Sequence, residues 1–177
     1  GSAADDGNVN INDAISTTGG TVTIVADRAL TDGNATGDDI TAASLSISTQ
    51  TGVAASGNPL ETNVGSIAAE ATTSGGIFIS ESDGLIVTTV GAVSGLNANA
   101  GAIAVTTGAE GSASTGLQIS QNVTADSGGS GTSTVTLTGT DENERFTLDD
   151  SRTVSSNNGK ITLTFDDFEI GTEIGTT

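Results

Sequence analysis

The chain has 177 residues, about the length of one domain, and carries a formal net charge of −18 at pH 7 with no Cys, Met, Trp or Tyr. Its four basic residues cannot form the patch that a polyanion requires, so nucleic acid is excluded as a partner and an anionic membrane surface fits poorly. The lack of cysteine excludes disulfides and thiolate metal sites together.

The composition also limits the core that the chain can build. Only four Phe supply large aromatic side chains, whereas 25 residues are Gly, and Ser and Thr are abundant. Thr favours strands and Gly favours corners, while good helix formers other than Ala are scarce. No apolar run approaches the roughly 18 residues that span a membrane. We therefore expect an all-β segment without membrane insertion over residues 3–177, preceded by a cloning remnant, Gly1-Ser2.

The amino-terminal part alternates apolar and polar residues in short runs. Val9 and Ile11 alternate with Asn residues. Val22 and Ile24 alternate with Thr, and both runs have the pattern of half-buried strands. Residues 31–39 follow as a polar excursion that is too rich in Gly and Asp to form a strand.

A repeat becomes visible at Leu45–Ser48, which reproduces the alternation of Val22–Val25 23 residues later. One coil of a parallel β-helix takes about that many residues. Each coil of such a solenoid buries only a few inward side chains and is covered by its neighbours, which suits a chain poor in bulky side chains. The one proline, Pro59, falls at a predicted corner, where a missing backbone donor is tolerated.

The stretch from Gly75 to Val93 contains two predicted strands and their corners. The apolar runs Ile77–Ile79 and Leu85–Val87 are punctuated by Gly-containing dipeptides and single glycines. This pattern is typical of strands joined by tight turns, and similar units recur before and after it.

The last third repeats the same pattern with larger side chains. Val135–Thr138 and Ile161–Thr164 match residue type for residue type, 26 positions apart, and a Phe-containing strand follows each. Residues 126–131 form either a long corner or a linker between repeat subtypes, and the spacing that resumes at once favours the corner. The predicted solenoid has about seven coils, a length of roughly 35 Å, and open sheet edges that adjoining coils must cover.

Several segments resemble repeats of giant bacterial surface proteins of the filamentous haemagglutinin and adhesin type. The residues that carry the resemblance are Ser44–Thr62, Val64, Ile67–Ala69, Gly75–Ile79 and Leu137–Thr147, in a likeness that covers about two thirds of the chain. The resemblance implies a right-handed parallel β-helix, export to the cell surface, and service as a stalk or adhesive shaft. It implies no catalytic residues.

Acidic clusters are the best candidates for a site, because calcium binds several oxygen ligands. None fits the EF-hand loop or the glycine-rich nonapeptide, so carboxylates in water remain the alternative for each cluster. The candidate ligands are Asp32, Asn34, Asp38 and Asp39; Asp141, Glu142, Asn143 and Glu144; and Asp149 and Asp150, to which Asp166 and Asp167 are possible additions. We expect Glu81 and Asp83 to be corner carboxylates in water.

Two other functions fit the residues less well. A polysaccharide-acting enzyme would use a basic residue or paired acids, but in the pairs Asp27-Arg28 and Glu144-Arg145 neighbouring side chains point to opposite faces of a strand. A regular Thr array can bind ice, and the outward Thr residues are Thr21, Thr23, Thr136, Thr138, Thr162 and Thr164. Ser and Ala take comparable places in the middle coils, so strand propensity explains the Thr residues.

The sequence therefore predicts a structural or adhesive segment of an exported bacterial surface protein, without enzymatic activity and located outside the cell or on its surface. The expected partners are neighbouring coils of the parent protein, a host or cell-surface protein or glycan, and further copies joined end to end. The alternative is a calcium-stabilised module on the same solenoid that binds a protein or glycan. A polysaccharide-acting enzyme is the third hypothesis.

Overall fold

The computed structural model describes residues 7–34, 37–108, 116–129 and 131–171, and every helix or strand in these ranges is a β-strand. Fifteen strands belong to one large sheet, which curls into a half-barrel and contains only parallel pairs. Two further sheets have two strands each. The predicted all-β, parallel architecture is confirmed in this form. The residues predicted to be a cloning remnant, Gly1-Ser2, lie outside the described ranges.

The strands are short, apart from two. The amino-terminal strands are β1 (Val9–Ile11), β2 (Ile15–Ser16), β3 (Thr21–Ala26), β4 (Leu30–Asp32), β5 (Ile40–Thr49) and β6 (Leu60–Ala71). The middle strands are β7 (Ile77–Glu81), β8 (Leu85–Val87), β9 (Thr89–Val90), β10 (Val93–Ser94), β11 (Leu96–Ala98) and β12 (Ile103–Thr107). The carboxyl-terminal strands are β13 (Leu117–Ile119), β14 (Val123–Ala125), β15 (Val135–Gly139), β16 (Arg145–Leu148), β17 (Val154–Ser156), β18 (Ile161–Thr164) and β19 (Asp167–Ile170).

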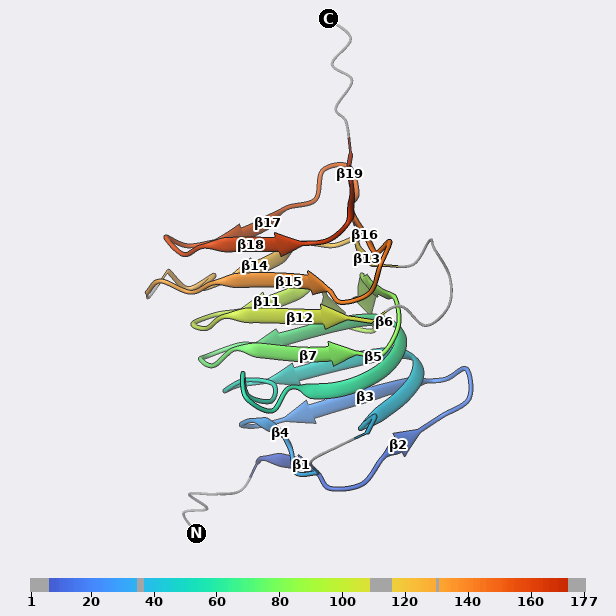
Figure 1. The fold of residues 1–177 in the computed structure, drawn as a ribbon. Helices are drawn as coiled ribbons and strands as arrows, with labels where there is room; N and C mark the ends of the chain where they lie inside the picture. Colours follow the sequence, from blue (N-terminus) through green and yellow to red (C-terminus); the bar gives the residue numbers. More distant parts are fainter. Residues whose placement is uncertain (1–6, 35–36, 109–115, 130, 172–177) are drawn as a thin grey trace, which may run out of the picture.

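Strands from successive passages of the chain pair in three ladders, which Figure 1 shows as stacked arrows. The first ladder contains β1, β4, β7, β12, β15 and β18, with Val53 bridging β4 to β7. The second contains β2, β5, β6, β8, β13, β16 and β19. The third contains β3, β5, β6, β11, β14 and β17. Because β5 and β6 are long enough to serve more than one ladder, they join the ladders into one curled sheet, and the bridges of Val53 link the two-stranded sheet of β1 and β4 to it.

Both repeats read from the sequence define the pairing register. Val22 pairs with Leu45 and Ile24 with Ile47, which is the predicted offset of 23 residues. Val135–Thr138 of β15 pairs with Ile161–Thr164 of β18, at the predicted offset of 26. The strands on either side of residues 126–131, β14 and β15, belong to the same large sheet. That placement agrees with the prediction of a corner between them.

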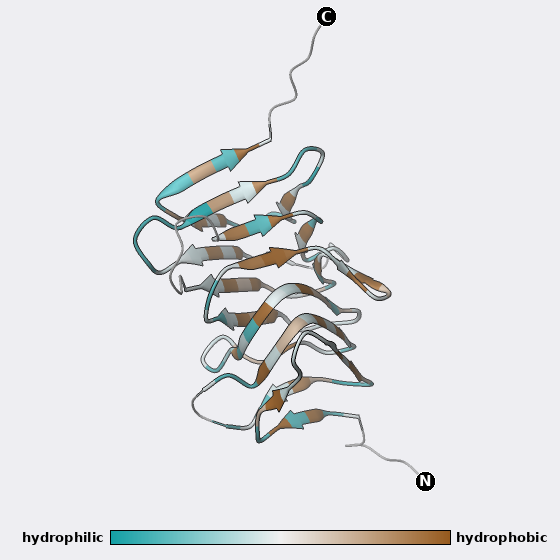
Figure 2. Ribbon diagram, turned by 90° about the vertical axis from the view of Figure 1, so that its right-hand side faces the viewer, coloured by the Kyte–Doolittle hydropathy of each residue, from teal (hydrophilic) through white to brown (hydrophobic). Residues whose placement is uncertain are grey.

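The core consists of inward side chains that stack on like side chains of the next strand. In the first ladder, Ile77 pairs with Ile103, Ile103 pairs with Val135, and all three are fully buried. Apolar segments recur at matching places along successive strands (Figure 2). Burying one such side chain contributes roughly 1.5–3 kcal/mol, so a narrow apolar column is enough to hold each layer on the next.

A small antiparallel hairpin covers part of the outer surface. Strands β9 and β10 pair with each other, and their Val90 and Val93 bury Ala68 of β6. This element departs from the parallel pattern of the large sheet. It explains how Ala68, an outward residue of the third ladder, is fully buried.

The corner at Gly75 has the tight geometry that its glycine pair predicts. Gly75 adopts a φ of +82°, a left-handed conformation that side chains disfavour, and an added Cβ would lie 2.1 Å from the Thr51 carbonyl oxygen. The corner therefore needs glycine for both its dihedral angle and its close approach to the preceding layer.

One prediction about a strand was wrong. Residues 31–39 were expected to be entirely irregular, but Thr31 and Asp32 belong to β4, where they pair with Asn10 and Ile11. The fully buried Leu30 begins this strand and anchors it in the core. Long-range pairing thus overrides the local turn composition at its first two residues.

Candidate functional site

Three carboxylates from different parts of the chain converge at one corner of the sheet. Asp32 ends β4, Asp39 directly precedes β5, and Glu61 is the second residue of β6. Each offers an oxygen within 4.8 Å of the other two. Asp39 lies beside Glu61 because Ile40 pairs with Thr62 in the neighbouring strands. Within the ranges that the structure describes, no other group of three acidic side chains is this close.

Hydrogen bonds fix the geometry of this cluster but leave oxygens without partners. The Asn34 amide NH₂ donates to Asp39 Oδ1 over 2.5 Å, and the Asn34 backbone N–H donates to Asp32 Oδ1 over 2.9 Å. The Glu61 backbone N–H donates to Asp39 Oδ2 over 3.2 Å. Asp32 Oδ2, Asn34 Oδ1 and Glu61 Oε2 are buried and have no hydrogen-bond partner. An unsatisfied buried acceptor costs about 1–3 kcal/mol.

Burial and the mutual repulsion of the carboxylates raise pKa values in this cluster. Burial raises the pKa of Asp39 above its ordinary value, and the charge of Asp32 raises it further, partly offset by the hydrogen bonds from Glu61 and Asn34. Burial likewise raises the pKa of Glu61, followed by the charges of Asp32 and Asp39. A protein that keeps three carboxylates together gains stability from any counter-charge that enters the cluster.

Sequence reasoning predicted only part of this cluster. Of the first predicted group, Asp32, Asn34 and Asp39 lie together in this cluster, whereas Asp38 is half-buried and lies outside the triad. Glu61 was missed. Its position was nevertheless readable, because Glu61 follows Asp39 by the same 22 residues that separate the paired Ser44 and Ser66.

The second predicted group, Asp141–Glu144, is divided between surface and core. Asp141, Glu142 and Asn143 are exposed, whereas Glu144 is only 2% exposed. Glu144 Oε2 accepts a hydrogen bond from Thr107 Oγ1 over 3.2 Å, and Oε1 is buried without a partner. Burial raises the pKa of Glu144, an effect that the Thr107 bond opposes and the charge of Asp141 reinforces.

A cavity of about 230 Å³ lies beside this second group, and its lining includes Asp141, Glu142, Phe165 and Asp166. Glu144 is not part of that lining. The second group therefore offers surface carboxylates on one side and a buried carboxyl on the other, and it does not form a compact set of ligands.

The third predicted group does not assemble. Asp149 accepts hydrogen bonds from Gln118 Nε2 over 2.9 Å and from Ser120 Oγ over 2.6 Å, while Asp150 is exposed. Asp166 Oδ2 accepts from the Asn143 backbone N–H over 2.8 Å. Asp167 forms an ion pair with Arg145 over 2.9 Å instead of joining Asp166.

The prediction for Glu81 was wrong, because this residue is a core carboxyl and not a corner group in water. Its side chain is 2% exposed, at the position where β7 pairs with Thr62 of β6. Glu81 Oε2 accepts from Thr62 Oγ1 over 2.7 Å, and Oε1 accepts from the Val64 and Ser82 backbone N–H groups over 3.0 Å and 3.1 Å. Burial raises the pKa of Glu81 to about 8 despite these bonds. Asp83 is half-buried.

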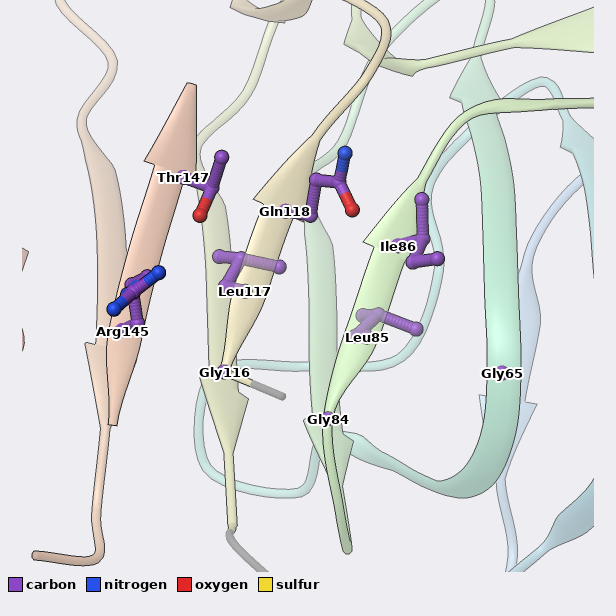
Figure 3. A pocket seen from close by; sticks show the side chains of 9 residues that line it. All are labelled: Gly65, Gly84, Leu85, Ile86, Gly116, Leu117, Gln118, Arg145 and Thr147. Atoms are coloured by element: carbon purple, nitrogen blue, oxygen red, sulfur yellow. The ribbon is translucent and has the colours of Figure 1, made fainter. Parts of the chain in front are cut away.

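A groove of about 230 Å³ crosses β8, β13 and β16 on the outer surface (Figure 3). Gly65, Gly84 and Gly116 leave its surface free of side chains in places, and the other lining residues are Leu85, Ile86, Leu117, Gln118, Arg145 and Thr147. Ion pairs with Asp167 and Glu169, at 2.9 Å and 3.1 Å, neutralise the guanidinium at this groove. The groove is lined mainly by apolar surface, and its polar side chains do not converge on one point.

The residues considered for catalysis and for ice binding lie as their strand patterns predict. Glu144 is buried and the adjacent Arg145 is exposed, because neighbouring side chains of an extended chain point to opposite faces. Thr136 pairs with Thr162 and Thr138 with Thr164 in the first ladder, as the alternating pattern predicts. The outward residues Thr21 and Thr23 lie in the third ladder, on β3.

Comparisons of the chain with protein-family models, with curated proteins and with solved structures found no match. The described ranges also contain no helix with the length and apolar character that a bilayer crossing demands. The geometry of the chain itself is therefore the basis for assigning a function.

Proposed function

We propose that the chain is a structural segment, a stalk or adhesive shaft, of a repetitive exported bacterial surface protein. In this proposal the curled sheet is a right-handed parallel β-helix of about seven coils, and each coil passes once through the three ladders. The chain serves as a spacer that holds other parts of the protein away from the cell and displays its own surface. In this proposal its surface residues catalyse no reaction.

The observation that carries the proposal is the constant register of the ladders. In the third ladder, six outward positions pair one after another along the stack. They are Val25, Ser48, Glu70, Asn97, Thr124 and Ser155. A chain that returns to the same column after every passage grows in length with each repeat, while each layer contacts only its neighbours. Such growth is the property that a spacer requires.

The carboxyl-terminal end of the stack supports a continuation of the solenoid. Ile161, Phe168 and Ile170 occupy the last layer, and their side chains are 41%, 46% and 55% exposed. Val135 and Phe146, which pair with Ile161 and Phe168 one layer earlier, are fully buried, and Leu148, which pairs with Ile170, is half-buried. An open edge of this kind pairs readily with another strand, so we assign neighbouring coils of the parent protein as its partner and a further copy as the competing occupant.

Surface location is tested by protease treatment of intact cells of the source bacterium. We expect peptides of residues 7–171 in the released fraction, while a cytoplasmic marker protein stays inside the cells. Recovery of these peptides only after lysis would contradict export. A control digestion of the purified chain must first identify which peptides the protease can release.

The second candidate function is a calcium-stabilised binding module on the same fold. The observation that favours it is the convergence of Asp32, Asp39 and Glu61 at one corner. This candidate differs from the first in a measurable property, because a metal-bound corner makes the thermal stability of the chain depend on the calcium concentration.

A further inference from the structure

A column of polar side chains runs through the core where β7, β12 and β15 end. Their last residues, Glu81, Thr107 and Gly139, pair with one another in successive layers, and Thr62 of β6 pairs with Glu81 from the layer before. Thr62 and Thr107 are fully buried, and Glu81 is 2% exposed. Carboxyl side chains are rarely buried to this degree, so the column interrupts an otherwise apolar core.

Glu144 continues this column from a different segment of the chain. A Cβ added to Gly139 would overlap Glu144 Oε2, so the buried Glu144 carboxyl takes the place of the side chain that Gly139 lacks. Thr107 Oγ1 donates to Glu144 Oε2 over 3.2 Å, as Thr62 Oγ1 donates to Glu81 Oε2 over 2.7 Å. The column thus contains two threonine–glutamate pairs, one above the other.

Both glutamates are better accommodated without a charge. Glu144 Oε1 is buried and has no hydrogen-bond partner, so ionisation would leave a charged oxygen unsatisfied in the core. Burial raises the pKa of both side chains. Nearby carboxylates add to this effect by repulsion, Asp83 at Glu81 and both Asp141 and Asp166 at Glu144.

The strands packed against the column bring no compensating positive charge. Strands β12 and β15 contain no charged residue, and β6 adds only the carboxylates Glu61 and Glu70. Arg145 follows Glu144 in the sequence, but its guanidinium lies on the outer surface, where it pairs with two carboxylates of β19. A proton is therefore the natural counter-charge for each buried glutamate.

A threonine hydroxyl is a suitable partner for a carboxyl that changes its protonation state, because it can both donate and accept. When Glu144 is protonated, its O–H can donate to Thr107 Oγ1, and the Thr107 hydroxyl can then donate to the Thr138 carbonyl oxygen, 3.5 Å away. The proton thus completes a run of hydrogen bonds from one layer to the next.

We propose that the two threonine–glutamate pairs form a pH-sensitive lock, which holds the ends of β7, β12 and β15 together while both glutamates are protonated. Loss of either proton places a charge in the core, and this corner then opens to water. Folding raises both pKa values, that of Glu81 to about 8, so the lock is closed in acid and opens as the pH rises. The proposal does not depend on the spacer role.

Hydrogen exchange of the whole chain shows where the structure opens. The backbone N–H groups of Ser82, Gly108 and Thr140 donate to carbonyl oxygens of the preceding layer at this corner, over 2.8, 3.0 and 3.0 Å. Their protection, corrected for the intrinsic exchange rate, should fall about tenfold more between pH 6 and pH 9 than that of Leu96 and Val123 in the third ladder. An equal fall at all five amides, or no fall at the corner, would overturn the lock.

Variants assign the effect to the two glutamates. The double variant Glu81→Gln, Glu144→Gln stays neutral, so protection at the corner should change by less than about twofold over the same range, while the exposed Glu142→Gln should behave as wild type. A double variant with the wild-type dependence would overturn the proposal.

If the double variant fails to fold, Thr107→Val replaces it, with the titration of Glu144 followed by NMR. Loss of the hydroxyl removes a hydrogen bond that favours the charged form, so Glu144 should titrate at a higher pH than in wild type. An unchanged titration midpoint would contradict the pairing of Thr107 with Glu144.

Discussion

At the scale of single residues, Phe146 is the largest side chain that is fully buried. It stacks in register between Leu117 and Phe168, and its ring centroid lies 5.4 Å from that of Phe165 and 5.9 Å from that of Phe168. In a core this thin, one aromatic side chain fills a large part of a layer, so its removal leaves a cavity that little else can close.

We predict that Phe146→Ala lowers the free energy of unfolding by about 3–5 kcal/mol, because it removes buried contacts and leaves a cavity. Phe168→Ala is the matched variant, since the same side chain is removed from a position that is 46% exposed, and its cost should stay below about 2 kcal/mol. Urea unfolding followed by circular dichroism measures both values. Equal losses would show that Phe146 is not the more deeply packed ring.

Glu81 makes the stability of the chain depend on pH. Its pKa is about 8 in the folded state, against 4.5 when unfolded, because burial disfavours its charge and the neighbouring Asp83 adds to that effect. The folded state therefore binds the proton more tightly. The stability contributed by the protonated form is complete below pH 4.5 and is lost as the pH rises to about 8, with a total effect of up to about 5 kcal/mol.

We predict that Glu81→Gln reduces the difference in unfolding free energy between pH 5 and pH 8, because glutamine stays neutral and keeps the acceptor. Glu144 has a raised pKa as well, so some dependence on pH remains in the variant. The exposed Glu142→Gln serves as the control. Urea unfolding in the presence of a chelator gives the values, and the same pH difference in wild type and Glu81→Gln would refute the role of Glu81.

The burial of individual acidic side chains could not be predicted from the sequence, for a physical reason. Glu81 follows an apolar run and precedes Ser82 and Asp83, so its local context is that of a polar corner. Its burial depends on Thr62 and Val64, whose hydroxyl and backbone donors come from the preceding passage of the chain. Only the pairing register places those donors beside it.

At the scale of elements, corners set where each strand begins. Gly75 illustrates the requirement, since its positive φ and its contact with the Thr51 carbonyl leave no room for a side chain. Gly57 is different, because an added Cβ there would meet nothing within 4 Å. The two glycines form a natural pair for comparing a required glycine with a replaceable one.

We predict that Gly75→Ala costs at least about 2 kcal/mol, because it combines an unfavourable φ with a steric clash against backbone. Gly57→Ala should change stability by less than about 1 kcal/mol in either direction. Thermal and urea unfolding of the two variants provide the comparison. A Gly75→Ala variant as stable as Gly57→Ala would mean that the corner relaxes without cost.

Strand positions and registers were largely predictable, and the candidate site was predictable only in part. Val22–Val25 and Leu45–Ser48 share one alternation of residue types, and like residues stack on like in parallel layers. The hairpin of β9 and β10 was not foreseen, because Val90 and Val93 look like core residues until Ala68 is placed beneath them. Glu61 was missed because the sequence shows acidic residues as a cluster only where they share one loop. The fold instead brings the three carboxylates together from two layers.

At the scale of the whole molecule, the chain is a stack of layers whose apolar column is narrow and whose surface is acidic. A net charge of −18 keeps such a body soluble and opposes sideways association of stacks. Three large apolar side chains of the last described layer, Ile161, Phe168 and Ile170, are exposed, and the proposed end-to-end partner would cover them. These features are the ones that the proposed spacer role requires.

The most direct test measures distances along one ladder by pulsed electron paramagnetic resonance between pairs of spin labels. The chain has no cysteine, so Val25→Cys can be paired in turn with Asn97→Cys, Thr124→Cys and Ser155→Cys. These positions lie three, four and five pairing steps from Val25. In-register stacking predicts narrow distributions near 14, 19 and 24 Å, at about 4.8 Å per step. Distances that fail to rise in this order, or broad distributions centred at the roughly 45 to 65 Å expected of flexible chains of these lengths, would contradict the stacked fold and the spacer role with it.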